Sequence, residues 1–575
     1  MLSQHAPESK YRFRDNAFIY ILILFGVILF WMPFYCKGLV ENGETSFHFA
    51  RVMTLADNIK AGILPAKIRP THMKDFGYGI GFFYPDLLIY PPAVAVALGV
   101  SYDIAIKVYL FIMSFIGGII TFHSFKRLSG STLIALVGEL VYMGTPLNDH
   151  NIFNGGGIPH LLSYMFLPLA LVGLYEAFKD EKKGYVRYAL GIFLVLLTHN
   201  MIFLTLFFVM VLIVLMHAKV IIKNVRILGK LFGVSLVAMA VSTAYWLPAM
   251  EQVYHIKFKC FYANAYDISK FILTFKQLVT ENLGIHIFVI FVISAILYIA
   301  LLIKRKAMPL DVTSMFFTII ITMWLMCSRA FWTSKIGQTL NFFEYTSRFE
   351  FVLCAMIALF LVMCLREVVA EGWLQKAPWI IVPGPAFYVL CVVIIVALRF
   401  TARPDFYNID RGGRIEYTHD NLYDAWRVSL GEWLPVECEA SECKEPNTAR
   451  TDGGSTAEGV KSDYAKSFDV WLPFDHEYYD MPYVYYYGYK AYLLDDTNNP
   501  LRELPVSEAF DDNGYVRVSI PEDLEGVGHV LVTYRKTFIQ KMSYIVSAAS
   551  IILLLAFVGI RKKKTKDDPK SKQRV

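Results

Sequence analysis

The chain has 575 residues, of which 56% are hydrophobic and only 18% are charged, and its mean hydropathy is +0.44. A soluble protein of this length would carry far more charge, so the composition excludes an ordinary soluble globular protein. The formal net charge of +6 does not indicate nucleic-acid binding, because the basic residues form short clusters beside apolar runs. We therefore expect a partner in membrane lipid and none in nucleic acid.

Apolar runs without charge, such as 17–35 and 204–216, predict membrane-spanning helices, because a backbone in lipid must satisfy its own hydrogen bonds. No small-residue cleavage site follows the first run, which is interpreted as a retained span. The sequence predicts an α-helical polytopic membrane protein with about twelve spans, near 17–36, 104–122, 131–147, 159–178, 187–198, 201–217, 231–249, 285–303, 313–327, 349–365, 379–398 and 542–560. A half-buried hairpin at 187–217 is an equal alternative to two full crossings.

The basic clusters all fall on one side of these spans if both termini are cytoplasmic, as the positive-inside rule requires. The predicted location is the plasma membrane, with multiple passes. Three parts follow: a multispan membrane domain at 1–400 with a first outer loop at 37–101, an outward-facing β-rich domain at 401–540, and the last span with a basic tail at 541–575.

The outer domain is predicted from alternating stretches such as 516–520 and 529–534, which indicate strands. Residues 437–462 are rich in Glu, Thr, Gly and Ser and are expected to form a mobile loop. Cys438 and Cys443 either close a short disulfide or remain reduced. The tyrosines crowded into 478–489 either fill the domain core, which strand alternation favours, or contact a glycan.

Candidate chemistry begins directly after the first predicted span. A helix from Thr45 to Gly62 would place Glu44, His48, Arg51 and Leu55 along one face, because steps of three and four residues return to the same side. A carboxylate, an imidazole and a guanidinium together offer a proton acceptor, a tunable donor and a phosphate-binding fork. A solvated polar face on an interfacial helix is an equal alternative.

Further along this loop, 76–86 interleaves glycines with aromatic residues, and 87–99 is apolar but too short to cross the membrane comfortably. The latter predicts a helix lying in the membrane interface. The glycine spacing is similar to that of a phosphate loop. No strand precedes it and no lysine follows it, which argues against a nucleotide site.

Several short motifs resemble a bacterial membrane family labelled 6-pyruvoyl-tetrahydropterin-synthase-related. They are Glu44 with Phe47-His48 and Arg51, then Gly77-Tyr78-Gly79, Phe83-Tyr84-Pro85, 197–200, 245–249 and Arg348. Segments 431–435 and 487–491 are similar to YfhO-type membrane proteins. Both groups resemble the GT-C glycosyltransferases, multispan enzymes that take sugars from polyprenyl-phosphate carriers. The similarity is scattered over most of the chain.

This resemblance implies a GT-C-like fold and transfer of a polyprenyl-phosphate-linked sugar to an envelope glycan or lipid acceptor. It assigns Glu44 as the base that deprotonates the acceptor. It also suggests a set of substrate-binding residues: His48, Arg51, Asp86, His150, His199 and Arg348. Arg51 and Arg348 would bind the departing phosphate; the alternatives are snorkelling or a surface ion pair, which are favoured more for Arg348 than for Arg51. The histidines are expected more as helix-end hydrogen-bonding groups than as catalysts.

No definite cofactor follows from the resemblance, and a divalent metal stays open. Pterin synthesis uses a soluble zinc enzyme, and the sequence has no compact histidine cluster for that metal. A non-catalytic envelope assembly scaffold and a transporter of lipid or polysaccharide are the alternative functions. Charges within the predicted spans are few, with Glu139 and Lys107 as the main ones, and this disfavours the transporter.

Overall fold

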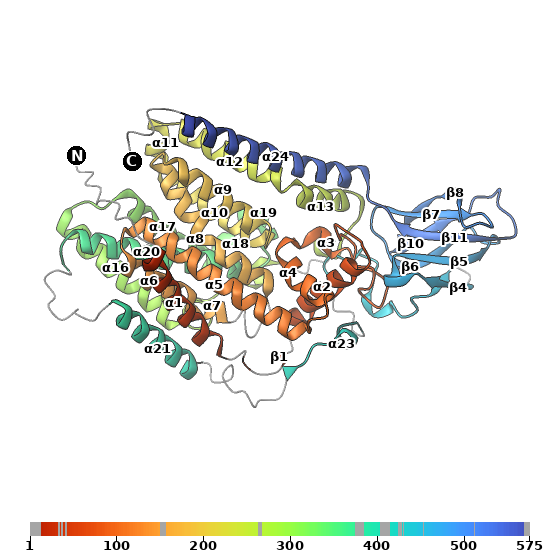
Figure 1. Cartoon of the computed structure of the whole chain (residues 1–575), viewed down its shortest axis with the longest axis horizontal. Helices are drawn as coiled ribbons and strands as arrows, with labels where there is room; N and C mark the ends of the chain where they lie inside the picture. The colour runs from red at the N-terminus through yellow and green to blue at the C-terminus, as the bar shows by residue number, and fades with distance from the viewer. Residues whose placement is uncertain are drawn as a thin grey trace.

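A helical body and a β domain lie at opposite ends of the molecule, and one long C-terminal helix runs from the β domain along the body (Figure 1). This computed structural model describes residues 13–32, 35, 38–40, 43–149, 157–262, 267–373, 384–402, 414–423, 428, 431–451, 454–510 and 512–567. The prediction of a helical membrane part joined to a β-rich domain is therefore confirmed in outline.

Six helices are long and apolar enough to cross a membrane: α5 (Tyr102–Ser129), α8 (Ile158–Phe178), α16 (Ile285–Arg305), α17 (Leu310–Cys327), α20 (Glu350–Ala370) with the turn before it, and α24 (Phe538–Asp567) over its first 19 residues. A seventh span is formed if α12 (Arg226–Val241) and α13 (Thr243–His255), which meet at 73°, count as one. Each of the seven lies where a span was predicted.

The predicted number of twelve spans is not confirmed. Among the described residues, five further helices contain apolar stretches of 10–17 residues: α1 (Phe13–Phe30), α4 (Tyr90–Ala97) with the turn before it, α6 (Thr132–Met143), α10 (Asn200–Met216) and α21 (Gly384–Ala402). Such helices are short for a hydrocarbon core that needs about 20 residues. The interfacial position expected for 87–99 stays a prediction, although a helix does form there.

The remaining helices are shorter or more polar. They are α2 (Gly43–Lys60), α3 (Ile80–Phe83), α7 (Pro146–Asp149), α9 (Lys182–Leu196), α11 (Ala218–Lys223), α14 (Lys259–Tyr262), α15 (Phe275–Gln277), α18 (Arg329–Trp332), α19 (Lys335–Thr339) and α23 (His419–Tyr423). Helices α8 and α9 pack closely because glycines line their contact. A side-chain carbon at Gly173 would lie 2.3 Å from the Tyr188 backbone nitrogen, so the two backbones meet where small residues allow it.

The β domain is a nine-stranded sheet in the order β8-β7-β11-β5-β4-β3-β6-β10-β9, with antiparallel neighbours. Its strands are β3 (Thr448–Arg450), β4 (Thr456–Lys461), β5 (Ser467–Pro473), β6 (Tyr478–Val484), β7 (Tyr489–Leu494), β8 (Pro500–Leu504), β9 (Val506–Glu508), β10 (Tyr515–Ser519) and β11 (Val527–Tyr534). The strands predicted at 516–520 and 529–534 are confirmed as β10 and β11. A separate pair joins β1 (Leu39–Val40) to β2 (Arg414–Ile415).

Two expectations for the β domain need comment. The expectation of a mobile loop throughout 437–462 is wrong, because β3 and β4 pair within it and bury Ala449 and Ala457. Cys438 and Cys443 are buried and reduced, and their side chains are in hydrogen-bond contact. Among the tyrosines crowded into 478–489, Tyr479, Tyr483 and Tyr486 are at most 1% exposed and lie in the core.

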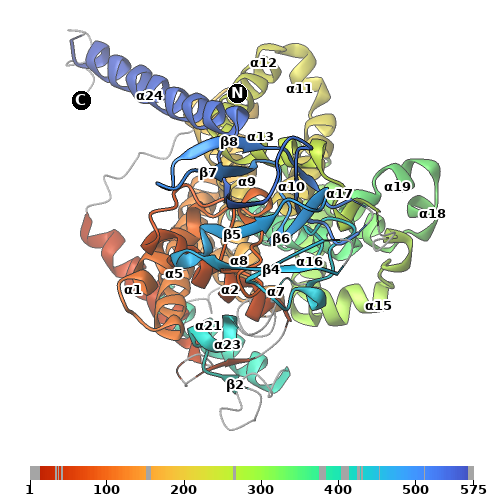
Figure 2. The same cartoon turned by 90° about the vertical axis from the view of Figure 1, so that its right-hand side faces the viewer.

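The first outer segment of the chain shares its hydrophobic core with the β domain. Phe76, Tyr78 and Phe82 belong to the same buried cluster as Tyr483 and Tyr486. In Figure 2 the sheet faces the viewer with α2 and α8 behind it. The core of the β domain is therefore completed by residues from the N-terminal part of the chain.

Glycine and aromatic residues alternate at 76–86 because this contact is close. A side-chain carbon at Gly79 would lie 2.4 Å from the Tyr486 ring, and one at Gly81 would lie 2.4 Å from the Ala66 carbonyl oxygen. Phe83 stacks on Trp433 with ring centroids 3.9 Å apart. The pattern that is similar to a phosphate loop is thus a packing pattern.

Candidate functional site

The candidate site is built on α2, and the helix predicted from Thr45 to Gly62 is confirmed with the bounds Gly43–Lys60. Glu44 lies in its first turn, where a carboxylate interacts favourably with the helix dipole. Gly62 follows with φ +69°, a conformation that suits glycine and ends the helix. The chain turn after α2 then brings the loop at 66–86 back against the same helix.

Asp86 joins two buried guanidinium groups. Its Oδ1 lies 3.1 Å from Arg51 Nη2, and its Oδ2 lies 2.5 Å from Arg69 Nη2. Arg51 is 1% exposed and Arg69 is 0% exposed. Since a buried charge must be paired, Asp86 fixes the loop at 66–86 to the middle of α2. The Asp86 carboxylate is thereby occupied by protein groups on both oxygens.

His48 lies one turn before Arg51 and is buried. Arg51 Nη1 lies 3.2 Å from His48 Nδ1, and because a guanidinium only donates, Nδ1 is the acceptor. Burial, with the nearby Arg51 and His160, holds the pKa of His48 well below its usual range. His48 is therefore neutral near pH 7 and carries its proton on Nε2.

Tyr84 lies at the centre of the site. Its ring is 4.7 Å from the Arg51 guanidinium carbon, and its centroid is 6.0 Å from that of His48 and 6.4 Å from that of His199. The Arg51 guanidinium thus lies over the aromatic ring of Tyr84. Burial and the nearby Glu432 carboxylate raise the pKa of Tyr84 well above its ordinary value, so its phenol stays protonated.

His199 is the N-cap of α10. Its Nδ1 accepts hydrogen bonds from the backbone N–H groups of Met201 and Ile202, at 3.2 and 3.4 Å. Its ring centroid lies 4.3 Å from that of His160 at the start of α8. His199 is therefore a helix-end hydrogen-bonding group, as expected, and it also borders Tyr84. His150 lies outside the described residues.

Arg348 lies in the short 3-10 turn before α20, residues Thr346–Phe349. It forms an ion pair with Glu344, its guanidinium carbon is 5.4 Å from the Tyr345 ring centroid, and its side chain is 17% exposed. Its buried Nε has no hydrogen-bond partner among the described residues. Arg348 is therefore a partly accessible cation that retains donor capacity.

Glu44 is exposed at the start of α2, yet protein surrounds it closely enough to perturb its carboxyl group. Partial burial raises the pKa of Glu44 above its ordinary value, and the Arg348 guanidinium opposes this shift. A raised pKa makes the carboxylate a stronger base. The guanidinium that influences Glu44 is thus that of Arg348, 304 positions later in the chain, whereas Arg51 is paired with Asp86.

A second carboxylate reaches this site from the segment that enters the β domain. Glu432 lies beside Trp433, which stacks on Phe83, and its charge contributes to raising the pKa of both Tyr84 and Tyr345. Among the described residues, no group of three or more His, Cys, Asp or Glu side chains is arranged to hold a metal ion.

Sequence reasoning identified part of this arrangement. The structure brings Glu44 and Arg348 together at one end of α2, and it brings His48, Arg51 and Asp86 together behind them, with His199 at the border. Sequence reasoning missed Arg69, Tyr84 and Glu432. Tyr84 lies within the aromatic stretch at 76–86, which was the available signal, whereas nothing in the sequence pairs Arg69 with Asp86.

Comparisons with known proteins give a family. Residues 83–409, more than half of the chain, match the model of a family described as "6-pyruvoyl-tetrahydropterin synthase related domain; membrane protein". An uncharacterized protein of Lactococcus lactis subsp. cremoris is 26% identical over 252 residues, which are 42% of this chain and 40% of that relative. The chain thus covers less than half of that relative's length.

Three solved structures are similar at low identity. ArnT from Cupriavidus metallidurans bound to undecaprenyl phosphate has 12% identity and a TM-score of 0.41, over 72% of this chain and 77% of ArnT. The oligosaccharyltransferase AglB from Archaeoglobus fulgidus has 11% identity and a TM-score of 0.38, over 69% of this chain and 56% of AglB. The arabinosyltransferase EmbB from Mycobacterium smegmatis has 11% identity and a TM-score of 0.35, over 93% of this chain and 64% of EmbB. These neighbours are GT-C glycosyltransferases, and similarities this low do not transfer an activity.

Proposed function

We propose, from the premise that this chain belongs to the membrane-protein family described as 6-pyruvoyl-tetrahydropterin synthase related, that it is a GT-C-like membrane glycosyltransferase. The donor would be a polyprenyl-phosphate-linked sugar, and the acceptor a glycan or lipid of the cell envelope. One observation carries the proposal: an accessible carboxylate of raised pKa, Glu44, lies within electrostatic reach of the partly accessible guanidinium of Arg348.

Glycosyl transfer needs these two kinds of group. As the acceptor hydroxyl oxygen forms a bond to the anomeric carbon, its proton passes to the Glu44 carboxylate. The bond from the anomeric carbon to the carrier phosphate breaks, and its electron pair leaves on the phosphate. A guanidinium stabilises that developing charge with parallel hydrogen bonds and does not lose its own proton. Arg348 is the residue proposed for this task.

The buried residues of the site are assigned a positioning role. Arg51 and Arg69 are engaged by Asp86, so they fix α2 against the loop at 66–86 and hold Glu44 at the end of a rigid helix. Neutral His48 accepts from Arg51 and lies one turn from Glu44. Of the two arginines expected to bind the phosphate, this assignment keeps only Arg348, because Arg51 is 1% exposed and the Arg348 side chain is 17% exposed.

Turnover of polyprenyl-phosphate-linked sugars by purified protein in nanodiscs tests the proposal. The substitution Glu44→Gln preserves the size of the side chain and removes the basic site. We expect it to lower transfer by about 10²–10⁴-fold, the usual contribution of a general base, with donor-lipid binding retained. Arg348→Lys should weaken transfer as well, because a point charge replaces a bidentate fork.

Two controls accompany these variants. Glu525→Gln changes an exposed carboxylate in the turn before β11 and should leave turnover unchanged. Glu432→Gln tests the second carboxylate of the site. Glu41, three residues before Glu44, is another candidate base and lies outside the described residues. Full activity in Glu44→Gln would remove Glu44 as the base, and a loss confined to Glu432→Gln would give that role to Glu432.

A further inference from the structure

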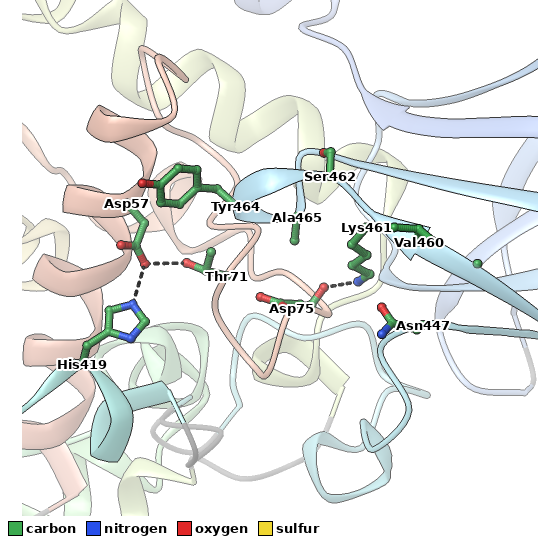
Figure 3. Close-up of a pocket in the computed structure, with 11 residues that line it drawn as sticks. Asp57, Thr71, Asp75, His419, Asn447, Val460, Lys461, Ser462, Tyr464 and Ala465 are labelled. Atoms are coloured by element: carbon green, nitrogen blue, oxygen red, sulfur yellow. Dashed lines mark hydrogen bonds and ion pairs between the residues drawn. The ribbon is translucent and has the colours of Figure 1, made fainter. Parts of the chain in front are cut away.

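A polar cavity of about 440 Å³ lies between the helical body and the β domain, at the end of α2 opposite Glu44. One wall is formed by Asp57 near the end of α2 and by the loop that carries Thr71 and Asp75; α23 contributes His419. The opposite wall is the β4–β5 turn with Lys461, Ser462, Tyr464 and Ala465, together with Asn447. In Figure 3 the Tyr464 side chain extends from that turn toward Asp57 and Thr71.

Hydrogen bonds within the walls hold the polar groups in place. Asp57 Oδ2 accepts from Thr71 Oγ1 at 3.0 Å and lies 3.4 Å from His419 Nε2 (Figure 3). Asp75 Oδ2 accepts from the Tyr423 hydroxyl at 2.8 Å. Each carboxylate is thus oriented by a neighbour on one oxygen, which pre-organises the wall for a ligand.

The backbone on both walls is in a rare conformation. Met73, Lys74 and Asp75 have φ of 58°, 54° and 69°, and Tyr464 and Ala465 have φ of 58° and 50°. The left-handed region is unfavourable for a residue that is not glycine, because its side-chain carbon crowds the backbone. Such residues persist where surrounding structure imposes them, and they cluster at ligand clamps. Two segments far apart in sequence therefore bring this strain to one cavity.

The charged side chains that line the cavity indicate which class of ligand it could bind. Two carboxylates, Asp57 and Asp75, line it, which disfavours a phosphate or another polyanion. The nearby Lys461 amine is already engaged, because it donates to the carbonyls of Asp75 and Pro482 and lies 3.9 Å from the Tyr483 ring centroid. No metal-binding group of three side chains is found among the described residues.

What these walls match is a ligand that both donates and accepts hydrogen bonds and has an apolar ring face. Carboxylates accept from hydroxyl groups, the Asn447 amide both donates and accepts, and Tyr464, which is 38% exposed, offers a flat ring. The Ser462 hydroxyl is already engaged by Ser467. The volume is within the usual range for a small-molecule site. A pyranose ring with its hydroxyl groups has this combination.

We propose that this cavity binds one neutral sugar unit of a glycan, at a site separate from the one at Glu44. Glu44 and Asp57 are thirteen residues apart on the same helix, which corresponds to about 20 Å. A glycan held here would be positioned by the helix that carries the candidate base. The choice of a glycan as the source of the sugar rests on the proposed function, whereas binding is measured without turnover.

Saturation-transfer NMR on the full-length protein in nanodiscs tests the site. The probes are soluble neutral tetrasaccharides of glucose, galactose, rhamnose and N-acetylglucosamine. We expect at least one to receive saturation from the protein. Tyr464→Asn, which keeps a residue that tolerates left-handed backbone, and Asp75→Asn should each weaken its affinity at least about tenfold. Asp496→Asn, an exposed position in the β7–β8 turn, is the matched control.

Absence of saturation transfer to every probe, or equal affinity in the wild type and both cavity variants, would overturn the proposal. Glu44→Gln should bind the probe like the wild type, because its side chain is at the other end of α2. Full turnover by Glu44→Gln would contradict the proposed function and leave this binding result standing, so the two failures are distinguishable.

Discussion

Asp86→Asn is expected to destabilise the protein severely, because one carboxylate compensates two buried guanidinium groups. Arg51 and Arg69 are 1% and 0% exposed and lie 3.1 and 2.5 Å from the Asp86 oxygens. Asparagine keeps the shape and one acceptor but removes the negative charge. Breaking a buried ion pair by neutralising one partner costs about 3–5 kcal/mol. Because the two arginines share one partner, their contributions are not additive, and we expect a loss within that range, not twice its value.

Reversible unfolding in mixed micelles of increasing SDS content, followed by intrinsic fluorescence, measures this free energy. Asp496→Asn is the control for loss of an aspartate charge at an exposed position. In the Arg51→Met background, Asp86→Asn should cost less, because one buried charge has already been removed. A loss below about 1 kcal/mol for Asp86→Asn in the wild-type background would refute the view that Asp86 neutralises the two arginines.

Three further outcomes are expected. Gly79→Ala should lower the free energy of unfolding by about 1–3 kcal/mol, since its new carbon would lie 2.4 Å from the Tyr486 ring; equal stability in the same titration would mean that the ring moves aside. Partial burial raises the pKa of Glu44, so turnover should fall as the pH is lowered through a value above 4.5, and a pH–rate profile that is level down to 4.5 would contradict this. A single cysteine at Ser455 should react with an impermeant label from outside and one at Ser571 should not; the reverse result would invert the predicted topology.

Local sequence patterns were sufficient to predict the helix of the site and two strands of the β domain, but not to predict which side chains of the site form ion pairs. The step of three and four residues correctly placed Glu44, His48 and Arg51 on one helix, and alternation correctly placed β10 and β11. Asp86 was named among the substrate-binding residues that the family resemblance suggests. Its two ion pairs depend on how the loop at 66–86 folds back on α2, and no sequence spacing encodes that geometry.

The number of spans was harder to predict because hydropathy reports composition and not helix length. Residues 131–147 form a mostly apolar run that contains Glu139, yet α6 ends at Met143. By contrast, α10 matches the predicted 201–217 within one residue and is capped by His199. At 231–249 the apolar run continues through a 73° bend between α12 and α13. Breaks of this kind are set by packing and capping, which a hydropathy window does not contain.

The core shared by the first outer segment and the β domain has a consequence for biogenesis. Lys461 and Asp75, which are in contact across it, are 386 positions apart. During synthesis, the N-terminal segment therefore leaves the ribosome long before the β strands that it packs against are made. Until then the apolar side chains of Phe76, Tyr78 and Phe82 stay exposed. Contacts of such long sequence separation form late and slowly. The interval between insertion of the first helices and synthesis of the last strands is thus when this chain is most dependent on chaperones and most vulnerable to proteases.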